Sequence, residues 1–474
     1  MGGLFSALQT ASTALDAISQ ALGVSQSNIA NASTPGYASQ SANILPIGTS
    51  ATGGSAGDFV DIRSSGNAFT DATVRAASSQ ASASQTQTVQ LNPINQLFDI
   101  TGASGILAAF QQFSTAFSNL SVTPNDPTAG AEALTAAGGV ASAFQSVAAN
   151  LDSQSTQLNS SIQNTTANIN TLSADISQLN IQTVASSASG QQNATTDASL
   201  RSDLDQLSSL VDVTVTTAPD GSVSVLAGGQ LPLVIGDQSY TLSADPTAAL
   251  GSQVSSSAGG NSPVSFSGQL GALLQTQNDT IVPLLGGNGQ TGSLNTLASG
   301  FASLVNTLLS SGTTEASTPA APIPGVPIFT YDQVNPTDAA RSLALDPTVT
   351  PDQLGLASAG PPAQSNGIAN QLSALASSTA AANQIGGLSA EGLFSSIAAS
   401  VGQQLSDATT NSSTDQNALT TAQTNRQQQS GVSLDQEAVN VTDYQRSYEA
   451  NAQIVSILNQ LTEDEVNMTI PSNG

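Results

Sequence analysis

The sequence is most restricted by the residue types that it lacks. Its 474 residues include no cysteine, histidine, lysine or tryptophan. Without cysteine there is no disulfide and no thiolate metal site, and without histidine the commonest general base and metal ligand is missing. Catalytic triads need a histidine or lysine base, and a Walker loop needs lysine. The composition therefore predicts a protein that is not an enzyme, with no catalytic, cofactor-binding or metal-binding residues.

Positive charge is also scarce. The chain has 32 acidic residues against six basic residues, all arginine, for a net charge of −26. Nucleic acids and anionic lipid surfaces require clustered cations, so neither is an expected partner. No run of 18 apolar residues occurs, and no basic residue precedes Arg63, so we expect neither a membrane span nor a cleaved secretory signal. Paired carboxylates can in principle catalyse glycoside hydrolysis, and the candidates in this chain are Asp203 with Asp205 and the run Glu463–Glu465. We expect both sets to lie on exposed helix faces.

Segments near both ends of the chain carry apolar stripes with helical spacing. The first stripe, predicted to lie on a helix over residues 4–30, is Leu4, Leu8, Ala11, Leu15, Ile18, Leu22 and Ile29. The second, on a helix that starts near Leu434, is Val441, Tyr444, Tyr448, Ala452, Val455 and Leu458. Neither helix can bury its stripe alone. We therefore predict that the two terminal helices pair as a coiled coil.

Between these segments, helical and strand patterns alternate. Residues 38–62 read as irregular, with a joint at Gly53-Gly54 and a short strand near Val60. Residues 67–210 read as helical. Leu151, Leu158, Leu172 and Leu179 recur at multiples of seven, and Ile162, Ile169 and Ile176 fill the alternate row, which is typical of a coiled coil. A period of two with a Pro-Asp-Gly turn at 219–221 predicts a β-hairpin within a β unit over 211–265. Residues 312–365 are rich in proline and loops, and 368–426 read as helical.

The predicted fold class is α+β and mainly α, with a paired terminal coiled coil, a long helical-bundle core and a small β-rich insertion. The predicted domains are nested. Residues 1–40 with 430–474 form the terminal assembly domain, residues 41–210 with 266–311 and 366–429 form the helical core, and residues 211–265 with 312–365 form the β-rich outer domain.

Two motifs carry a family resemblance. Residues 28–37 read NIANASTPGY, and residues 430–437 and 444–452 read SGVSLDQE and YQRSYEANA. The first resembles the N-terminal signature of the bacterial flagellar rod, hook and hook-associated proteins, and the others resemble the matching C-terminal signature. The resemblance places assembly residues at Asn31, Thr34, Pro35, Gly36 and Tyr37, beside the two stripes. The long helical region and the segment 267–274 resemble the hook-associated members, which join hook and filament.

The resemblance implies a structural subunit of the flagellum. Its expected partners are identical subunits in a ring, the hook protein, the next hook-associated junction protein, and an export chaperone at the C-terminal helix. Its expected location is extracellular, after type III export without a cleaved signal peptide. Two alternatives stay open: a hook or distal rod protein of the same family, and a secreted adhesin-type binding module carried by residues 211–265.

Overall fold

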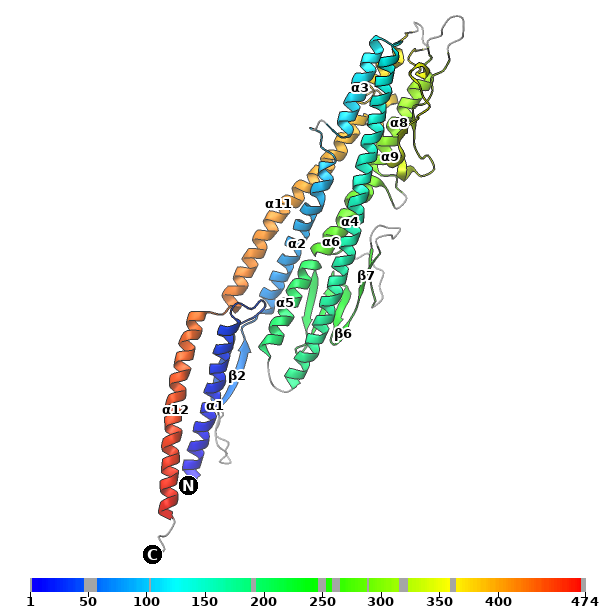
Figure 1. Ribbon diagram of the computed structural model, residues 1–474. Coiled ribbons are helices and arrows are strands. Elements are labelled where there is room, and N and C mark those ends of the chain that lie inside the picture. The colour runs from blue at the N-terminus through cyan, green and yellow to red at the C-terminus, as the bar shows by residue number, and fades with distance from the viewer. Residues whose placement is uncertain are drawn as a thin grey trace. The chain divides into compact units, whose positions relative to one another are not determined.

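A computed structural model describes residues 2–46, 58–101, 104–188, 193–245, 253–257, 265–287, 290–314, 323–358 and 364–469. Long helices dominate it, with small antiparallel sheets between them (Figure 1). The α-helices are α1 (Gly2–Asn31), α2 (Ala68–Gln96), α3 (Ile106–Val122), α4 (Pro127–Ala188), α5 (Ala194–Leu210), α6 (Gly268–Gln275), α7 (Val282–Leu285), α8 (Ser293–Ser311), α9 (Ala339–Ser342), α10 (Gly367–Ser373), α11 (Ala390–Ser430) and α12 (Leu434–Thr469). A π-helix, η1 (Thr276–Ile281), joins α6 to α7, and short 3-10 turns are η2 (Pro336–Asp338), η3 (Pro351–Gln353) and η4 (Ala381–Asn383).

The strands are short and pair only with antiparallel neighbours. They are β1 (Gln40–Pro46), β2 (Asp58–Ser64), β3 (Val213–Thr217), β4 (Val223–Ala227), β5 (Leu231–Ile235), β6 (Gln238–Ser239), β7 (Leu242–Asp245), β8 (Gln253–Ser256), β9 (Phe329–Thr330) and β10 (Ala344–Leu345). One four-stranded sheet has the order β3-β4-β5-β6, and the other described sheets are the pairs β1-β2, β7-β8 and β9-β10.

The chain forms two compact units. The terminal unit consists of Met1–Gln80, Ile169–Thr241 and Asp415–Gly474, and the central unit consists of Ala81–Asn168 and Leu242–Thr414. The division falls within the long helices α2, α4 and α11. The three-domain division made from the sequence stays a prediction.

In the terminal unit, the four-stranded sheet is fixed by one buried amide. The Asn180 side chain on α4 donates to the Val223 carbonyl over 2.8 Å and to the Gly236 carbonyl over 2.7 Å, and it accepts from the Val223 N–H over 2.9 Å. Two hairpins are thereby held to one helix. The predicted β-hairpin is confirmed, with Val215 opposite Val225.

In the central unit, several of the few aromatic residues form one cluster. Phe110 and Phe113 on α3, Phe144 on α4 and Phe301 on α8 are fully buried. The Phe110 ring lies 4.7 Å from that of Phe301 and 5.9 Å from that of Phe144, measured between centroids. These rings bury a large apolar surface at one place and contact one another in edge and tilted arrangements. The other core positions of the chain are largely alanine, valine and leucine.

The helical predictions over 4–30 and 67–210 and near 434 are confirmed in outline. Ile162, Ile169 and Ile176 of the α4 heptad row are fully buried. The prediction of an unbroken helical region over 368–426 is wrong, because α10 ends at Ser373 and α11 starts only at Ala390. The prediction that residues 38–62 are irregular is wrong for 40–46, which form β1 against β2, and the Gly53-Gly54 joint lies outside the described residues. Among the described helices, none has the length and apolarity needed to cross a membrane.

Candidate assembly site

The two terminal helices pack against each other in the terminal unit (Figure 1). On α1 the predicted stripe is covered unevenly: Ile29 is 40% exposed, and the others are buried (Ala11 and Ile18) or half-buried (Leu4, Leu8, Leu15 and Leu22). On α12 the predicted stripe is half-buried at Val441, Tyr444, Ala452, Val455 and Leu458, and Tyr448 is 43% exposed. The structure brings both stripes into one helix pair, and their part in assembly stays a prediction.

Helix α1 has a second buried face, which the sequence interpretation missed. Ala17, Ala21, Val24, Ser25 and Asn28 are all buried, and α1 contacts both strands of the β1-β2 hairpin. Small residues at 17, 21, 24 and 28 have helical spacing, so the signal was present. It did not stand out because alanine and serine are abundant along the whole chain. A helix with two covered faces can hold α12 and the hairpin at once.

Asn28 is the centre of this arrangement. Its side chain is fully buried and uses every hydrogen-bonding group that it has. Its Nδ2 donates to the Gln40 carbonyl and to Glu437 Oε1, each over 2.8 Å. Its Oδ1 accepts from the Tyr37 hydroxyl over 2.8 Å and from the Gln40 N–H over 2.9 Å. One side chain therefore joins α1, the turn that follows it, strand β1 and α12.

The motif residues after Asn28 form a compact turn. The Asn31 amide donates to the Ser27 carbonyl over 2.9 Å, and the Thr34 hydroxyl donates to Asn31 Oδ1 over 3.3 Å. The Tyr37 N–H donates to the Thr34 carbonyl over 3.2 Å, and the Pro35 ring is exposed. These bonds are local, so the turn is set by its own sequence.

Gly36 lets this turn approach helix α5 closely. Its φ is +75°, which L side chains rarely adopt. A Cβ at this position would lie 2.4 Å from the Ala198 carbonyl oxygen and 2.9 Å from the Ser202 nitrogen. Only glycine fits, and the predicted Pro-Gly element is thus a docking contact within the subunit as well as a turn.

Three serines connect the start of β1, the end of β2 and the end of α11. The Ser39 N–H donates to the Ser430 carbonyl over 2.9 Å, and the Ser65 N–H donates to the Ser39 carbonyl over 2.8 Å. The hydroxyls of Ser65 and Ser430 each donate to the other residue's carbonyl, over 3.2 and 3.1 Å. Because α12 starts only four residues after Ser430, these bonds fix where the C-terminal helix leaves α11.

A cluster of charged residues lies on α2, α5 and α11, in the terminal unit. It contains the carboxylates of Asp71 and Asp205 and three arginines, Arg75, Arg201 and Arg426, which are half of the arginines in the chain. Arg426 contacts Asp205 at 2.6 Å and Asp71 at 3.8 Å, and Arg201 contacts Asp71 at 3.6 Å. Three cations meet two carboxylates here. In a chain with so few cations, this concentration ties three helices to one another.

Burial sets the protonation behaviour of this cluster. Burial raises the pKa of Asp205, and the positive charge of the neighbouring Arg426 partly opposes this effect. Burial also lowers the pKa of Arg75, and the negative charge of Asp205 partly opposes that effect. Asp205 Oδ1 is buried without a hydrogen-bond partner. The expectation that Asp203 and Asp205 lie on an exposed face is wrong, because both residues are half-buried. The paired carboxylate of Asp205 is structural.

The other side of α12 carries apolar residues that α1 leaves uncovered. Val439 is 54% exposed and Ile457 is 56% exposed, and the remaining members of this exposed row are Ile454 and Leu461. They lie on α12 outside the stripe predicted from the sequence. Large apolar side chains in this number on one helix are typical of a surface that is covered in an assembly.

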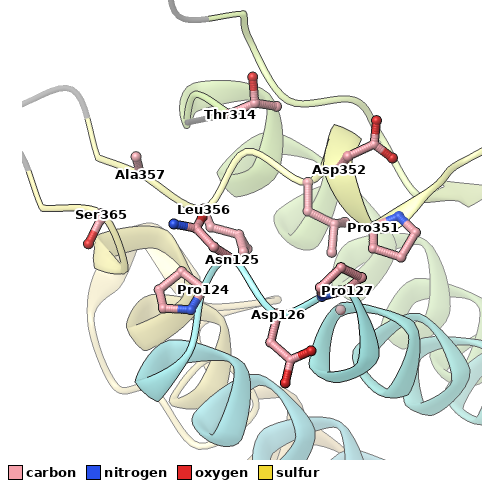
Figure 2. Close-up of a pocket in the computed structure, with 12 residues that line it drawn as sticks. Pro124, Asn125, Asp126, Pro127, Thr314, Pro351, Asp352, Leu356, Ala357 and Ser365 are labelled. Atoms are coloured by element: carbon pink, nitrogen blue, oxygen red, sulfur yellow. The ribbon is translucent and has the colours of Figure 1, made fainter. Parts of the chain in front are cut away.

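A pocket in the central unit is lined mainly by proline, small and apolar residues, with two carboxylates, Asp126 and Asp352. It has a volume of about 310 Å³ and lies between the α3–α4 turn and the segment 351–357 (Figure 2). Pro351 lies against Gly130 in its wall. The carboxylates of Asp126 and Asp352 point in different directions (Figure 2), and Asp126 Oδ1 accepts the Thr128 N–H over 2.9 Å at the start of α4. Among the described residues, no group of three or more acidic side chains could hold a metal ion.

Comparison with known families gives matches at both ends and in the middle. Residues 91–323 match the model of the flagellar hook-associated protein FlgK helical domain. Residues 8–37 match the flagella basal body rod protein model, and residues 416–468 match the model of the flagellar basal body rod FlgEFG protein C-terminal region. The two outer matches contain Asn28 and two of its hydrogen-bond partners, Tyr37 and Glu437. Among curated protein sequences, no significant match is found.

One solved structure has the same fold. The flagellar hook junction protein FlgK from Burkholderia pseudomallei aligns with a TM-score of 0.62 at 16% sequence identity. The alignment covers 75% of this chain and 99% of that chain. At this identity the likeness extends to the fold.

Proposed function

We propose that the chain is a structural subunit of the hook–filament junction, a member of the flagellar hook-associated proteins, and that its paired terminal helices are the element through which it assembles. The observation that carries this proposal is the exposed row on α12. α1 covers the predicted stripe of α12 in part, leaving Tyr448 43% exposed, whereas Val439, Ile454 and Ile457 on the other side are about half exposed. An apolar row that the subunit itself does not cover is suited to contact a neighbouring subunit.

The occupant that we propose for this row is the terminal helix pair of an identical subunit in a ring. A helix pair with an additional apolar face can join a larger helical bundle by packing of the same kind. At the two sides of the ring, the partners would be the hook protein and the next hook-associated junction protein. Before assembly, the same exposed row on α12 would be the binding surface for the export chaperone.

The flagellar location follows from the family, and the finer statement is part of the proposal. We place the assembled subunit outside the cell, after export through the flagellar type III system without a cleaved signal peptide. The role is structural and requires no catalytic group, in keeping with a sequence that has neither histidine nor cysteine.

The test is complementation of a strain that lacks this chain. Hooks without filaments are expected in that strain, and the full-length chain should restore filaments. A chain without residues 1–37 should not restore them, because α12 would lose the helix that covers its stripe. Full motility with the truncated chain would contradict the assembly role.

The same strain separates the alternatives. Long tubes built of this chain would indicate a hook or distal rod protein, and normal filaments in its absence would favour an adhesin-type module.

A matched pair of variants tests the exposed row. Ile457→Ser removes an exposed apolar group from α12, and Ser456→Ala changes its exposed neighbour without adding charge. Ile457→Ser should lower the number of filaments while leaving the helical content of the purified chain unchanged. Equal filament numbers for the two variants would exclude the row as a subunit contact.

A further inference from the structure

Apolar stripes alone define the pairing of α1 and α12 poorly. Leucine, alanine and valine recur at steps of three and four along both helices, so a slip by one heptad would still cover much of both stripes. In paired helices of this kind, a buried polar residue at a single position can fix the register, at some expense of stability. Asn28 and Glu437 form such a contact between α1 and α12.

We propose that Asn28 and Glu437 are positioning residues that fix the register of the terminal helices and make their pairing depend on the folded turn and on β1. The proposal rests on the assembly role given above to these helices. The Asn28 carboxamide is satisfied only when Tyr37, Gln40 and Glu437 are all in place. Two of these groups come from the segment after α1, and the third lies 409 residues away from Asn28 in the chain.

The buried carboxylate of Glu437 also depends on this contact. Glu437 is only 8% exposed, and its hydrogen bonds come from the neutral amides of Asn28 (2.8 Å) and Asn440 (3.3 Å). In the described part of the chain, no arginine forms a salt bridge with it. A buried carboxylate without a cation depends strongly on each donor, because an unmet partner leaves it desolvated and unpaired.

A slipped pairing would violate these requirements at both residues. The α12 residue seven positions from Glu437 is Tyr444, so a slip by one heptad along α12 would bring Asn28 opposite Tyr444. Glu437 would lose its Asn28 donor, and the Asn28 amide would lose its charged acceptor. Hydrogen bonds to a charged group are stronger than those between neutral groups, so the native register is favoured over the slipped ones.

The experiment uses the complementation assay with two single variants and their combination. Asn28→Asp places a second carboxyl group against Glu437, and Glu437→Gln supplies an amide in place of the acceptor. The double variant Asn28→Asp/Glu437→Gln reverses donor and acceptor at the same place. The controls are Asn43→Asp on β1 and Glu449→Gln on α12, which make the same chemical changes at exposed positions.

Filaments per cell are counted by electron microscopy, and the chain released into the medium is measured to separate export from assembly. Asn28→Asp should reduce filaments at least about tenfold, because a hydrogen bond to a charged acceptor is replaced by repulsion between two carboxyl groups. The double variant should recover a substantial part of this loss, whereas both controls should match the unchanged chain.

Two results would overturn the proposal: wild-type filament numbers with Asn28→Asp, or a double variant no better than Asn28→Asp. Failure of the assembly role itself is a separate outcome, because then the unchanged chain would not restore filaments to the deletion strain.

Discussion

Replacing Gly36 with alanine tests whether the turn after α1 must lie directly on α5. The new Cβ would be 2.4 Å from the Ala198 carbonyl oxygen, a backbone atom that cannot move without shifting α5. Alanine at a φ of +75° costs about 1–2 kcal/mol, and steric overpacking typically costs about 1–3 kcal/mol. We therefore expect Gly36→Ala to lower the free energy of opening of the terminal helix pair by about 2–5 kcal/mol.

Gly23 provides the matched control on the same helix. It lies in the interior of α1, is exposed, and an added Cβ there would meet no atom within 4 Å. The change from glycine to alanine in a helix interior stabilises by about 1 kcal/mol, so Gly23→Ala should have the opposite sign.

The assay is native-state hydrogen exchange of the α1 amides in the purified chain, read by mass spectrometry. A decrease of about 2 kcal/mol corresponds to roughly 30-fold faster exchange in Gly36→Ala. Gly23→Ala should exchange more slowly than the unchanged chain. Equal exchange in Gly36→Ala and the unchanged chain would refute the close-approach argument, and faster exchange in Gly23→Ala would show that α1 is disturbed by any substitution.

Three further predictions concern other contacts of the terminal unit. Arg426→Met should destabilise the unit by about 3–5 kcal/mol in urea unfolding at neutral pH, because Asp205 loses its partner. Since burial already raises the pKa of Asp205, protonation favours the folded state, and this deficit should shrink as the pH falls towards 4; a deficit independent of pH would contradict the assignment. Asn180→Ala should cost about 2–3 kcal/mol and speed exchange at Val223, whereas unchanged exchange there would show that the amide does not hold the sheet. Tyr448→Ser should reduce filaments more than it lowers the melting temperature of the free chain, and equal loss of both would argue against a role in assembly.

Sequence periodicity was sufficient for the elements whose buried face follows a regular spacing. The stripes of α1 and α12, the isoleucine row of α4 and the Val213–Val225 hairpin were all predicted, because each is a local pattern set by helix or strand geometry. Strand β1 was missed since its sequence, QSANILP, alternates only weakly and ends at a proline. The break between α10 and α11 was missed because alanine and serine continue through it without an apolar period.

Much of the candidate site was marked by the two motifs, yet its central contacts were not. Asn28 and Glu437 stand inside the motifs that carry the family resemblance, but nothing local shows that they touch. The arginine cluster likewise joins residues from three distant helices.

The sequence by itself determined that both ends of this chain are amphipathic helices and that catalysis by histidine, cysteine or lysine is excluded. Only the tertiary structure decided which faces meet and which apolar row remains exposed on α12. The physical reason is that an apolar stripe shows which face of a helix must be buried, but it does not show which other segment buries that face. The segment that packs on a stripe is determined by contacts between side chains hundreds of residues apart, and these contacts form only when the chain has folded.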